Sequence, residues 1–173
     1  KNPFSFCYDK KSAHIIGKNH ETYRNFSLIS DLINIKYQKP HLHFTEAEIQ
    51  KVLPLKSKPF VCMAPASVWF TKQLPSAKWA ELILTIPDNI KIYFLGAPTD
   101  LALCNEIRLL SSHPNIEILC GKLTLTESAA LMQHAEMNYV NDSAPLHLAS
   151  AVNAPVTSFF CSTVPEFGFG PLS

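Results

Sequence analysis

The feature that most constrains this chain is a regular alternation of short apolar stretches and amphipathic stretches that begins at Phe60. Each apolar stretch is almost continuously hydrophobic, and a short polar loop follows it. This pattern is typical of parallel strands whose two faces are both covered by helices. The sequence therefore predicts an α/β fold with a parallel, doubly wound sheet. The predicted strands are 60–64, 90–95, 116–119, 137–140 and 155–160, and the predicted helices are 76–85, 100–111, 126–134 and 145–152.

The first 59 residues are less regular. Two short strands are expected, over 4–8 and 13–16. Apolar residues at helical spacing predict a helix over 20–35. A second helix is expected over 45–53, because Thr45 and Glu48 have the spacing of a capping box. The remaining segments, 36–44 (with one extended piece) and 54–59, are expected to be linkers.

Composition excludes several classes of protein. The 173 residues suffice for one ordinary domain with flanking structure, and the net charge of +1 argues against a general nucleic-acid binder. The five cysteines form no CxxC pair, which favours reduced thiols in a cytosolic protein and disfavours a zinc site. No segment has the length of a membrane span. Because the chain begins at Lys1 without a signal-peptide pattern and stops abruptly, both ends are expected to be cuts in a longer protein.

Missing motifs exclude some ligands. The sequence has no GxGxxG, so a nicotinamide or flavin dinucleotide is not expected. It has no GxxxxGK[ST], so it is not a P-loop enzyme, and no Asp-x-Asp pair that could hold a metal–diphosphate.

Polar candidates lie in the loops that follow the predicted strands. In doubly wound sheets, ligands bind beyond the carboxyl ends of the strands. Those loops are 65–71, 96–100, 121–123 and 141–143, and we expect them to meet at one edge of the sheet. Their polar residues, or the residues directly after them, are Lys72, Asp100, Lys122, Asp142 and Ser143.

The last of these loops opens a helix. Pro145 suits the first helical turn, and either Asp142 or Ser143 could cap it. Unpaired N–H groups at such a start attract an anion. A Ser-His-Asp hydrolase triad is excluded, because Ser143 lacks the flanking glycines of a nucleophile elbow. Two interpretations remain open: a plain cap with His147 as a hydrogen-bonded core residue, or a phosphate and sugar site.

Three other positions also have two interpretations each. Lys72 is either a solvated surface residue or a charge that neutralises phosphates. Asp100 is expected to cap the following helix and, functionally, to reach ribose hydroxyls. Trp69 and Phe70 either stack on a base or cover the core.

The stretch Val140-Asn141-Asp142-Ser143-Ala144-Pro145-Leu146-His147-Leu148-Ala149 resembles the signature of the glycosyltransferase family 9 enzymes, the heptosyltransferases of lipopolysaccharide core assembly. Four further blocks occur in that family's order, so the similarity covers 60–171 well and 1–59 loosely. These blocks are 64–75, 94–100, 121–127, and 159–165 with Gly170-Pro171.

The resemblance implies a GT-B fold, of which this chain would be the C-terminal, donor-binding half with a Rossmann-like sheet. Residues 1–20 would end the N-terminal acceptor domain, 21–59 would be a connector, and 60–173 would be the truncated donor domain. The implied reaction transfers heptose from ADP-heptose to a lipopolysaccharide core acceptor, with inversion and without a metal or cofactor. The implied location is cytoplasmic, with at most a peripheral association with the inner membrane.

The resemblance also assigns roles to residues. Lys72 would contact the donor diphosphate with Ser67 nearby, Asp100 the adenosine ribose, and Asp142 the hydroxyls of the donor sugar. Ser143, Ala144 and the helix start would receive the diphosphate, with His147 in support. Lys72, Asp142 and His147 are the expected catalytic residues, and the general base would belong to the N-terminal half.

This sequence departs from the family pattern at several positions. Ala66 and Ala144 stand where the family usually has Gly, so each adds a methyl group beside the expected phosphate. Leu74 replaces a preferred Trp, and Cys161-Ser162 replaces a frequent Gly-Pro. These departures leave two alternatives open: a non-catalytic sugar-nucleotide-binding domain derived from such an enzyme, or a nucleotide-sugar epimerase.

Overall fold

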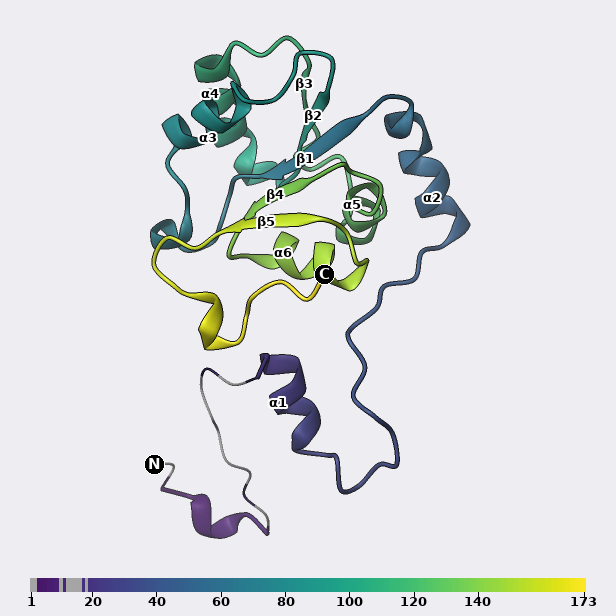
Figure 1. Ribbon diagram of the computed structural model, residues 1–173, viewed down its shortest axis with the longest axis vertical. Helices are drawn as coiled ribbons and strands as arrows, with labels where there is room; N and C mark the ends of the chain where they lie inside the picture. The colour runs from purple at the N-terminus through teal and green to yellow at the C-terminus, as the bar shows by residue number, and fades with distance from the viewer. Residues whose placement is uncertain (1–2, 10, 12–16, 18) are drawn as a thin grey trace.

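A computed structural model describes residues 3–9, 11, 17 and 19–173 (Figure 1). Its centre is a five-stranded, wholly parallel sheet with the order β3-β2-β1-β4-β5. The order reverses between β1 and β4, which creates the switch point of a doubly wound sheet. The predicted α/β fold class is confirmed. The strands are β1 (Phe60–Ala64), β2 (Lys91–Phe94), β3 (Ile116–Ile118), β4 (Asn138–Asn141) and β5 (Val156–Phe159).

Helices cover both faces of the sheet (Figure 1). On one face, α3 (Ser76–Ile83) and α4 (Leu101–Ser111) pack against each other; on the other, α5 (Leu125–Met132) lies between α2 (Glu46–Val52) and α6 (Ala144–Ala151). Since successive side chains of a strand point to opposite faces, the central strand divides its residues between two cores. Phe60, Cys62 and Ala64 join one core, and Val61 and Met63 join the other.

Every residue of β1 is buried, which explains why its sequence is apolar throughout rather than alternating. The core beneath α3 is anchored by Trp79, whose fully buried ring meets that of Phe159 edge-on at 5.1 Å between centroids. Full burial of a large apolar side chain stabilises a fold by about 1.5–3 kcal/mol. The sheet edge that carries the site is therefore held by a well-packed core.

Three predictions in the N-terminal part need comment. The expected strand over 4–8 is wrong, because Ser5–Cys7 form a 3-10 turn. The expected strand over 13–16 lies outside the described residues. The helix predicted over 20–35 is only α1 (Glu21–Ser27), and no strand forms over 36–44. Leu28 and Leu32 remain exposed beyond the end of α1, so no apolar burial favours a longer helix there.

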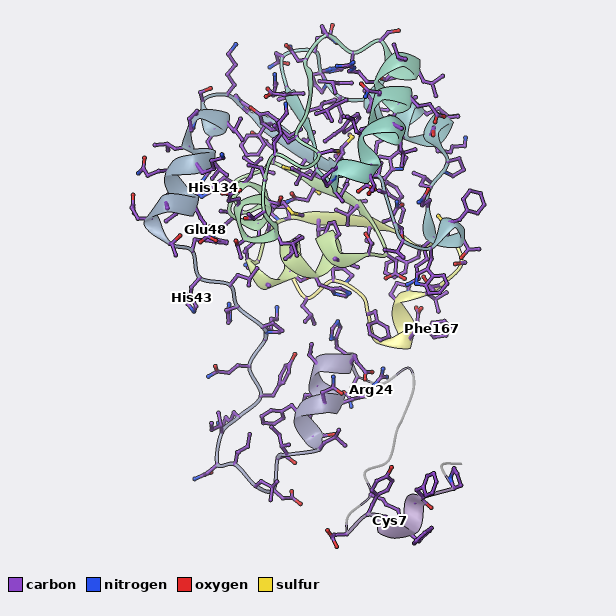
Figure 2. All side chains as sticks on the ribbon, turned by 180° about the vertical axis from the view of Figure 1, so that it is seen from behind. Cys7, Arg24, His43, Glu48, His134 and Phe167 are labelled. Atoms are coloured by element: carbon purple, nitrogen blue, oxygen red, sulfur yellow. The ribbon has the colours of Figure 1, made fainter. Side chains whose placement is uncertain are left out.

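Two helix starts show capping boxes. In α2, the Thr45 side chain accepts from the Glu48 N–H and the Glu48 carboxylate accepts from the Thr45 N–H, as predicted. Thr126 of α5 also donates to the Glu48 carboxylate, which ties the two helices together; Figure 2 labels Glu48 near the start of α2. The start of α5 differs from the predicted residue 126, because Thr124 and Glu127 form its capping box two residues earlier.

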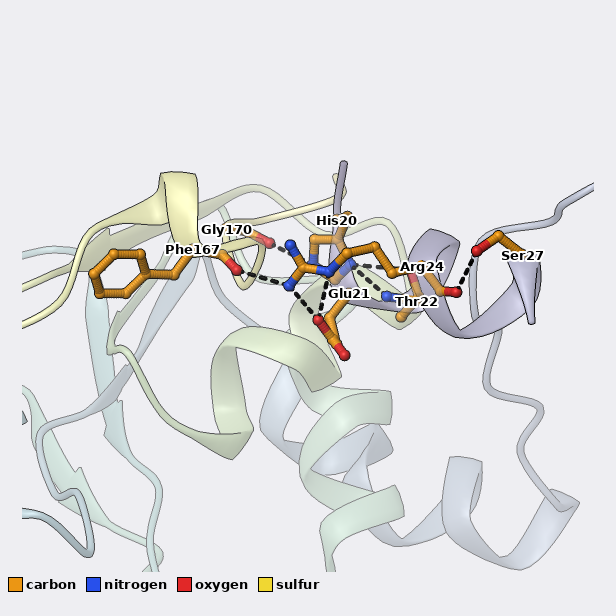
Figure 3. A network of polar contacts seen from close by, with 7 residues as sticks. All are labelled: His20, Glu21, Thr22, Arg24, Ser27, Phe167 and Gly170. Carbon is orange, nitrogen blue, oxygen red and sulfur yellow. Dashed lines mark hydrogen bonds and ion pairs between the residues drawn. The ribbon is translucent and has the colours of Figure 1, made fainter. Parts of the chain in front are cut away.

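The C-terminal segment packs against α1 (Figure 3). The Glu21 N–H donates to the Gly168 carbonyl at 2.8 Å, and Arg24 Nη2 donates to the Phe167 carbonyl at 2.9 Å. Gly168 has a φ of +98°, and a Cβ there would lie 2.8 Å from Arg24 Nη2, so only glycine suits this contact. The same segment also contacts α6, because the Leu172 N–H donates to Ser150 Oγ at 3.0 Å.

Within the part of the chain that the structure describes, no helix is both long and apolar enough to cross a membrane.

Candidate active site

A pocket of about 590 Å³ lies at the carboxyl edge of the sheet. Its walls come from the loops after β1, β2 and β3 and from the start of α6, which are the four loops expected to meet there. A pocket at this place and of this size is usual for a small-molecule site in a doubly wound fold. Residues from each contributor include Ser67, Asp100, Gly121 and Ala144.

The seven predicted site residues fall into two groups. Ser67, Asp100, Ser143 and Ala144 line the pocket. The other three, Lys72, Asp142 and His147, are not among the lining residues. They lie beside it, on the turn of 70–72 and on the segment from the end of β4 into α6.

Lys72 and Asp142 form an ion pair. Lys72 Nζ donates to Asp142 Oδ2 at 2.6 Å, and Thr163 Oγ1 donates to the same oxygen at 2.7 Å. The carboxylate is only slightly exposed, and burial alone would raise its pKa. The two hydrogen bonds and the positive charge of Lys72 outweigh burial and hold the pKa of Asp142 below its ordinary value. Lys72 is thus a paired group, not a freely solvated surface lysine.

Asn141 is a positioning residue that sequence reasoning missed. It is fully buried at the end of β4. Its Oδ1 accepts from the Leu74 N–H at 3.2 Å, and its Nδ2 donates to the Pro65 carbonyl at 2.6 Å. One amide thereby holds both ends of the loop that carries Ser67 and Lys72. The available signal was a polar residue directly after the predicted strand 137–140.

The start of α6 has no side-chain cap. Ser143 occupies the N-cap position with extended backbone, but its side chain makes no capping bond, and Oγ lies 3.4 Å from the Asn141 carbonyl. The Asp142 carboxylate is instead used by Lys72 and Thr163. The expectation that either residue caps the helix by its side chain is therefore wrong. A helix start without a side-chain cap leaves N–H groups for a ligand.

His147 lies on the exposed side of α6, and within the described residues its side chain has no hydrogen bond. Its ring meets that of Phe169 edge-on, with 6.5 Å between centroids. The pKa of His147 is below its ordinary value, first because neighbouring atoms displace water from the ring, and also because of Lys72; the Asp142 charge acts in the opposite direction. The interpretation of His147 as a hydrogen-bonded core residue is wrong.

Asp100 occupies the expected N-cap position of α4, but its side chain makes no capping bond to that helix. Its Oδ2 accepts from the Ala97 N–H at 2.7 Å, so it closes the tight turn of residues 97–100 at the pocket wall. Gly96 must be small here, because a Cβ would lie 2.8 Å from Asp100 Oδ2. Among the described residues, the second oxygen, Oδ1, accepts a hydrogen bond only from the neighbouring Thr99 hydroxyl, at 3.4 Å.

Trp69 and Phe70 are 68% and 86% exposed, so the interpretation that they cover the core is wrong. The neighbouring Val68 lines the pocket and is 97% exposed. The loop thus presents exposed apolar side chains, of which Val68 lines the pocket. Among the described residues, no group of three or more His, Cys, Asp or Glu side chains is arranged to hold a metal ion.

Comparison with known proteins identifies relatives of this chain. It is 45% identical over 107 residues to a lipopolysaccharide heptosyltransferase 3 of Escherichia coli, an alignment that covers 60% of this chain and 32% of that protein. The chain therefore spans about a third of the length of this curated relative.

Two solved structures share the fold. The glycosyl transferase family 9 protein of Veillonella parvula superposes with a TM-score of 0.81 at 18% identity, covering 97% of this chain and 51% of that one. E. coli heptosyltransferase WaaC with ADP superposes with a TM-score of 0.63 at 24% identity, covering 89% of this chain and 49% of that one. These structures place the sheet in the GT-B class.

The family model described as glycosyltransferase family 9 (heptosyltransferase) matches residues 3–173, which is nearly the whole chain. Since this match includes the pocket loops, the Asp142 turn and the C-terminal segment, the chain belongs to glycosyltransferase family 9, the heptosyltransferase family.

Proposed function

We propose that this chain is the donor-binding part of a metal-independent, inverting glycosyltransferase, and that its donor is a nucleotide-diphospho-sugar, ADP-heptose. The observation that carries the proposal is the composition of the pocket wall. It contains both Asp100, in the loop after β2, and the start of α6, which has no side-chain cap. A nucleoside diphosphate needs a partner for its ribose and a partner for its phosphates. Family membership and a structural neighbour that is described with ADP support this ligand.

In the proposed complex, Asp100 accepts from the ribose hydroxyls through the oxygen that is not used by Ala97. Ser67, Ser143 and Ala144 surround the diphosphate at the start of α6. The helix N–H groups and dipole stabilise an anion at that place. The exposed Trp69 and Phe70 are close enough in sequence to Val68 to reach the mouth of the pocket and stack on the base.

Lys72 and Asp142 act at the reacting end of the donor. The leaving group is a nucleoside diphosphate, so the transition state develops negative charge on the phosphates. Lys72 stabilises that charge, and Asp142 orients the donor sugar by accepting from its hydroxyls. His147, on α6, supports the diphosphate. The general base that activates the acceptor comes from the N-terminal half of the whole protein.

The acceptor in this proposal is a lipopolysaccharide core sugar, brought by the N-terminal half. The domain division at residues 20 and 59 is part of the same proposal, as is a cytoplasmic location with at most a peripheral association with the inner membrane. The proposal needs no cofactor.

Calorimetric titration tests the donor site. The chain should bind ADP and ADP-heptose more tightly than the guanosine and uridine analogues, and Asp100→Ala should weaken ADP binding about tenfold, as expected for the loss of a charged hydrogen bond of about 1.4 kcal/mol. Asp88→Ala is the matched control, because Asp88 is an exposed acid in the loop before β2, outside the pocket. A folded sample that binds no nucleotide would contradict the proposal.

One observation favours a second candidate, a sugar-nucleotide-binding domain without transferase activity. Both alanines that replace the family's usual glycines, Ala66 and Ala144, line the pocket. The full-length protein distinguishes the two. A transferase should lose turnover about a thousandfold with Asp142→Asn in protein that is still folded at the assay temperature; a binding protein shows no turnover in either form.

A further inference from the structure

Two buried cysteines meet behind the pocket wall. Cys104 lies on α4 and Cys120 lies two residues after the end of β3, and their sulfur atoms are 3.3 Å apart in a thiol–thiol hydrogen bond. Cys104 is fully buried and Cys120 is 8% exposed. The pair joins α4 to the segment after β3, at the carboxyl edge of the sheet.

The pair is next to residues of the site. A Cβ at Gly96 would lie 3.2 Å from Cys120 Sγ and 2.8 Å from Asp100 Oδ2, so the sulfur and the carboxylate share one side of that glycine. Cys104 follows Asp100 by one helical turn. Gly121, the residue after Cys120, lines the pocket, and its N–H donates to the Gly96 carbonyl at 2.9 Å. Cys120 therefore lies directly behind the pocket wall that Gly96 and Gly121 form.

The two thiols are not equivalent. The hydrogen bond from Cys104 lowers the pKa of Cys120, although burial and the Asp100 charge act against it. The same hydrogen bond, together with burial, raises the pKa of Cys104. Cys120 is therefore the better attacking group, since the thiolate is the nucleophile in thiol–disulfide exchange.

We propose that Cys104 and Cys120 form a redox-active dithiol, a modification site that closes to a disulfide when it meets a small disulfide oxidant. The Cys120 thiolate attacks one sulfur of the oxidant and displaces one thiolate. Cys104 then attacks the mixed disulfide at the Cys120 sulfur, giving up its proton, and releases the second thiol. Two protein S–H groups are oxidised, and one external disulfide is reduced to two thiols.

Closure brings the two sulfur atoms into bonding distance. The sulfurs must approach from 3.3 Å to the disulfide length of about 2.05 Å. Cys62 provides an internal comparison. It is also buried, and burial raises its pKa. Among the described residues it has no hydrogen bond to another cysteine sulfur. Cys7 and Cys161 are exposed and would react first with any reagent, so both should be replaced.

The test uses the Cys7→Ser/Cys161→Ser protein, treated with hydroxyethyl disulfide without oxygen. Remaining thiols are alkylated in denaturant, and the peptides are identified by mass spectrometry. We expect a peptide pair joined through Cys104 and Cys120, about tenfold more abundant than any pair that contains Cys62, because the two sulfurs are held together. Folded protein in which Cys104 and Cys120 are both recovered as alkylated thiols would overturn the proposal.

Two further measurements separate the dithiol from simple reactivity. Cys104→Ala should stop the reaction at a mixed disulfide on Cys120; cross-linking to Cys62 instead would overturn the proposal. If that variant does not fold, phenylarsine oxide tests the unaltered pair, since trivalent arsenic binds two adjacent thiols. One arsenical per chain and a block of the cross-link are expected, and no arsenical bound would count against the pair. None of these outcomes depends on the ligand of the pocket.

Discussion

The ammonium group of Lys72 lies 2.6 Å from Oδ2 of Asp142, although the two residues are 70 positions apart in the chain. The contact joins the turn that follows the β1 loop to the turn that opens α6. It places one positive and one negative group in direct contact beside the pocket. A donor that binds there must interact with a pair that is already formed.

Replacement of Lys72 by Met should destabilise the fold, because Asp142 is 4% exposed and would keep only Thr163 as a partner. The expected loss is about 1–3 kcal/mol in the free energy of unfolding, measured with urea. Lys78→Met is the matched control. Lys78 pairs with Glu81 on the surface, where both side chains are more than half exposed, and its loss should cost less than about 0.5 kcal/mol. Equal losses in the two variants would contradict the assigned role.

The Asp142 carboxylate should make stability depend on pH in the acid range. Its pKa in the folded protein lies below its ordinary value of 3.8, so the unfolded chain binds the proton more tightly. The stabilisation is therefore complete well above pH 3.8 and is lost as pH falls towards the folded pKa. Urea unfolding between pH 5 and about pH 2.5 should show a shallower acid loss for Asp142→Asn than for the wild type. Parallel curves would show that the pair contributes nothing to acid stability.

Asn141→Ala should loosen the loop that carries Ser67 and Lys72. The change leaves the Leu74 N–H and the Pro65 carbonyl without their side-chain partner, at an expected cost of about 2–4 kcal/mol. Hydrogen exchange of the Leu74 amide should become faster. Asn105→Ala is the control, because the Asn105 amide bonds only within α4, to Leu101 and Arg108, and little change is expected. An unchanged Leu74 exchange rate would refute this role.

Ala144→Gly should lower the free energy of unfolding and strengthen ADP binding. Glycine in the first turn of α6 costs about 0.5–1 kcal/mol relative to alanine. Removal of the methyl group opens the pocket where a diphosphate would approach the backbone, so ADP should bind more tightly. Calorimetry and urea unfolding on the same sample measure both effects. Weaker ADP binding would show that the methyl group is not in the path of the phosphate.

The sheet could be predicted because its signals are local. Each strand lies in a short, largely apolar stretch, and each of the first four is followed by a loop and a helical repeat. All five strands were found, with ends that differ by at most one residue. The position of the pocket followed from the same pattern, since the loops after parallel strands share one edge. The helix over 20–35 was predicted too long, because periodicity does not reveal whether an apolar face finds a partner.

The partners of the polar side chains could not be predicted. Sequence patterns selected Lys72, Asp100 and Asp142, but they did not show that Lys72 bonds to Asp142 or that Asp100 closes its own turn. Asn141 was missed although it directly follows a predicted strand, and Thr163 was missed because it has no distinctive local pattern.

The sequence by itself thus determined a parallel α/β sheet, the edge at which a ligand would bind, and the family resemblance. These depend on the order and spacing of residues along the chain. Only the tertiary structure decided which of the chosen side chains line the pocket, which pair with each other, and that Cys104 meets Cys120. The reason is that hydrogen bonds and ion pairs form over about 3 Å, whereas the residues that form them are brought together by packing of elements far apart in sequence.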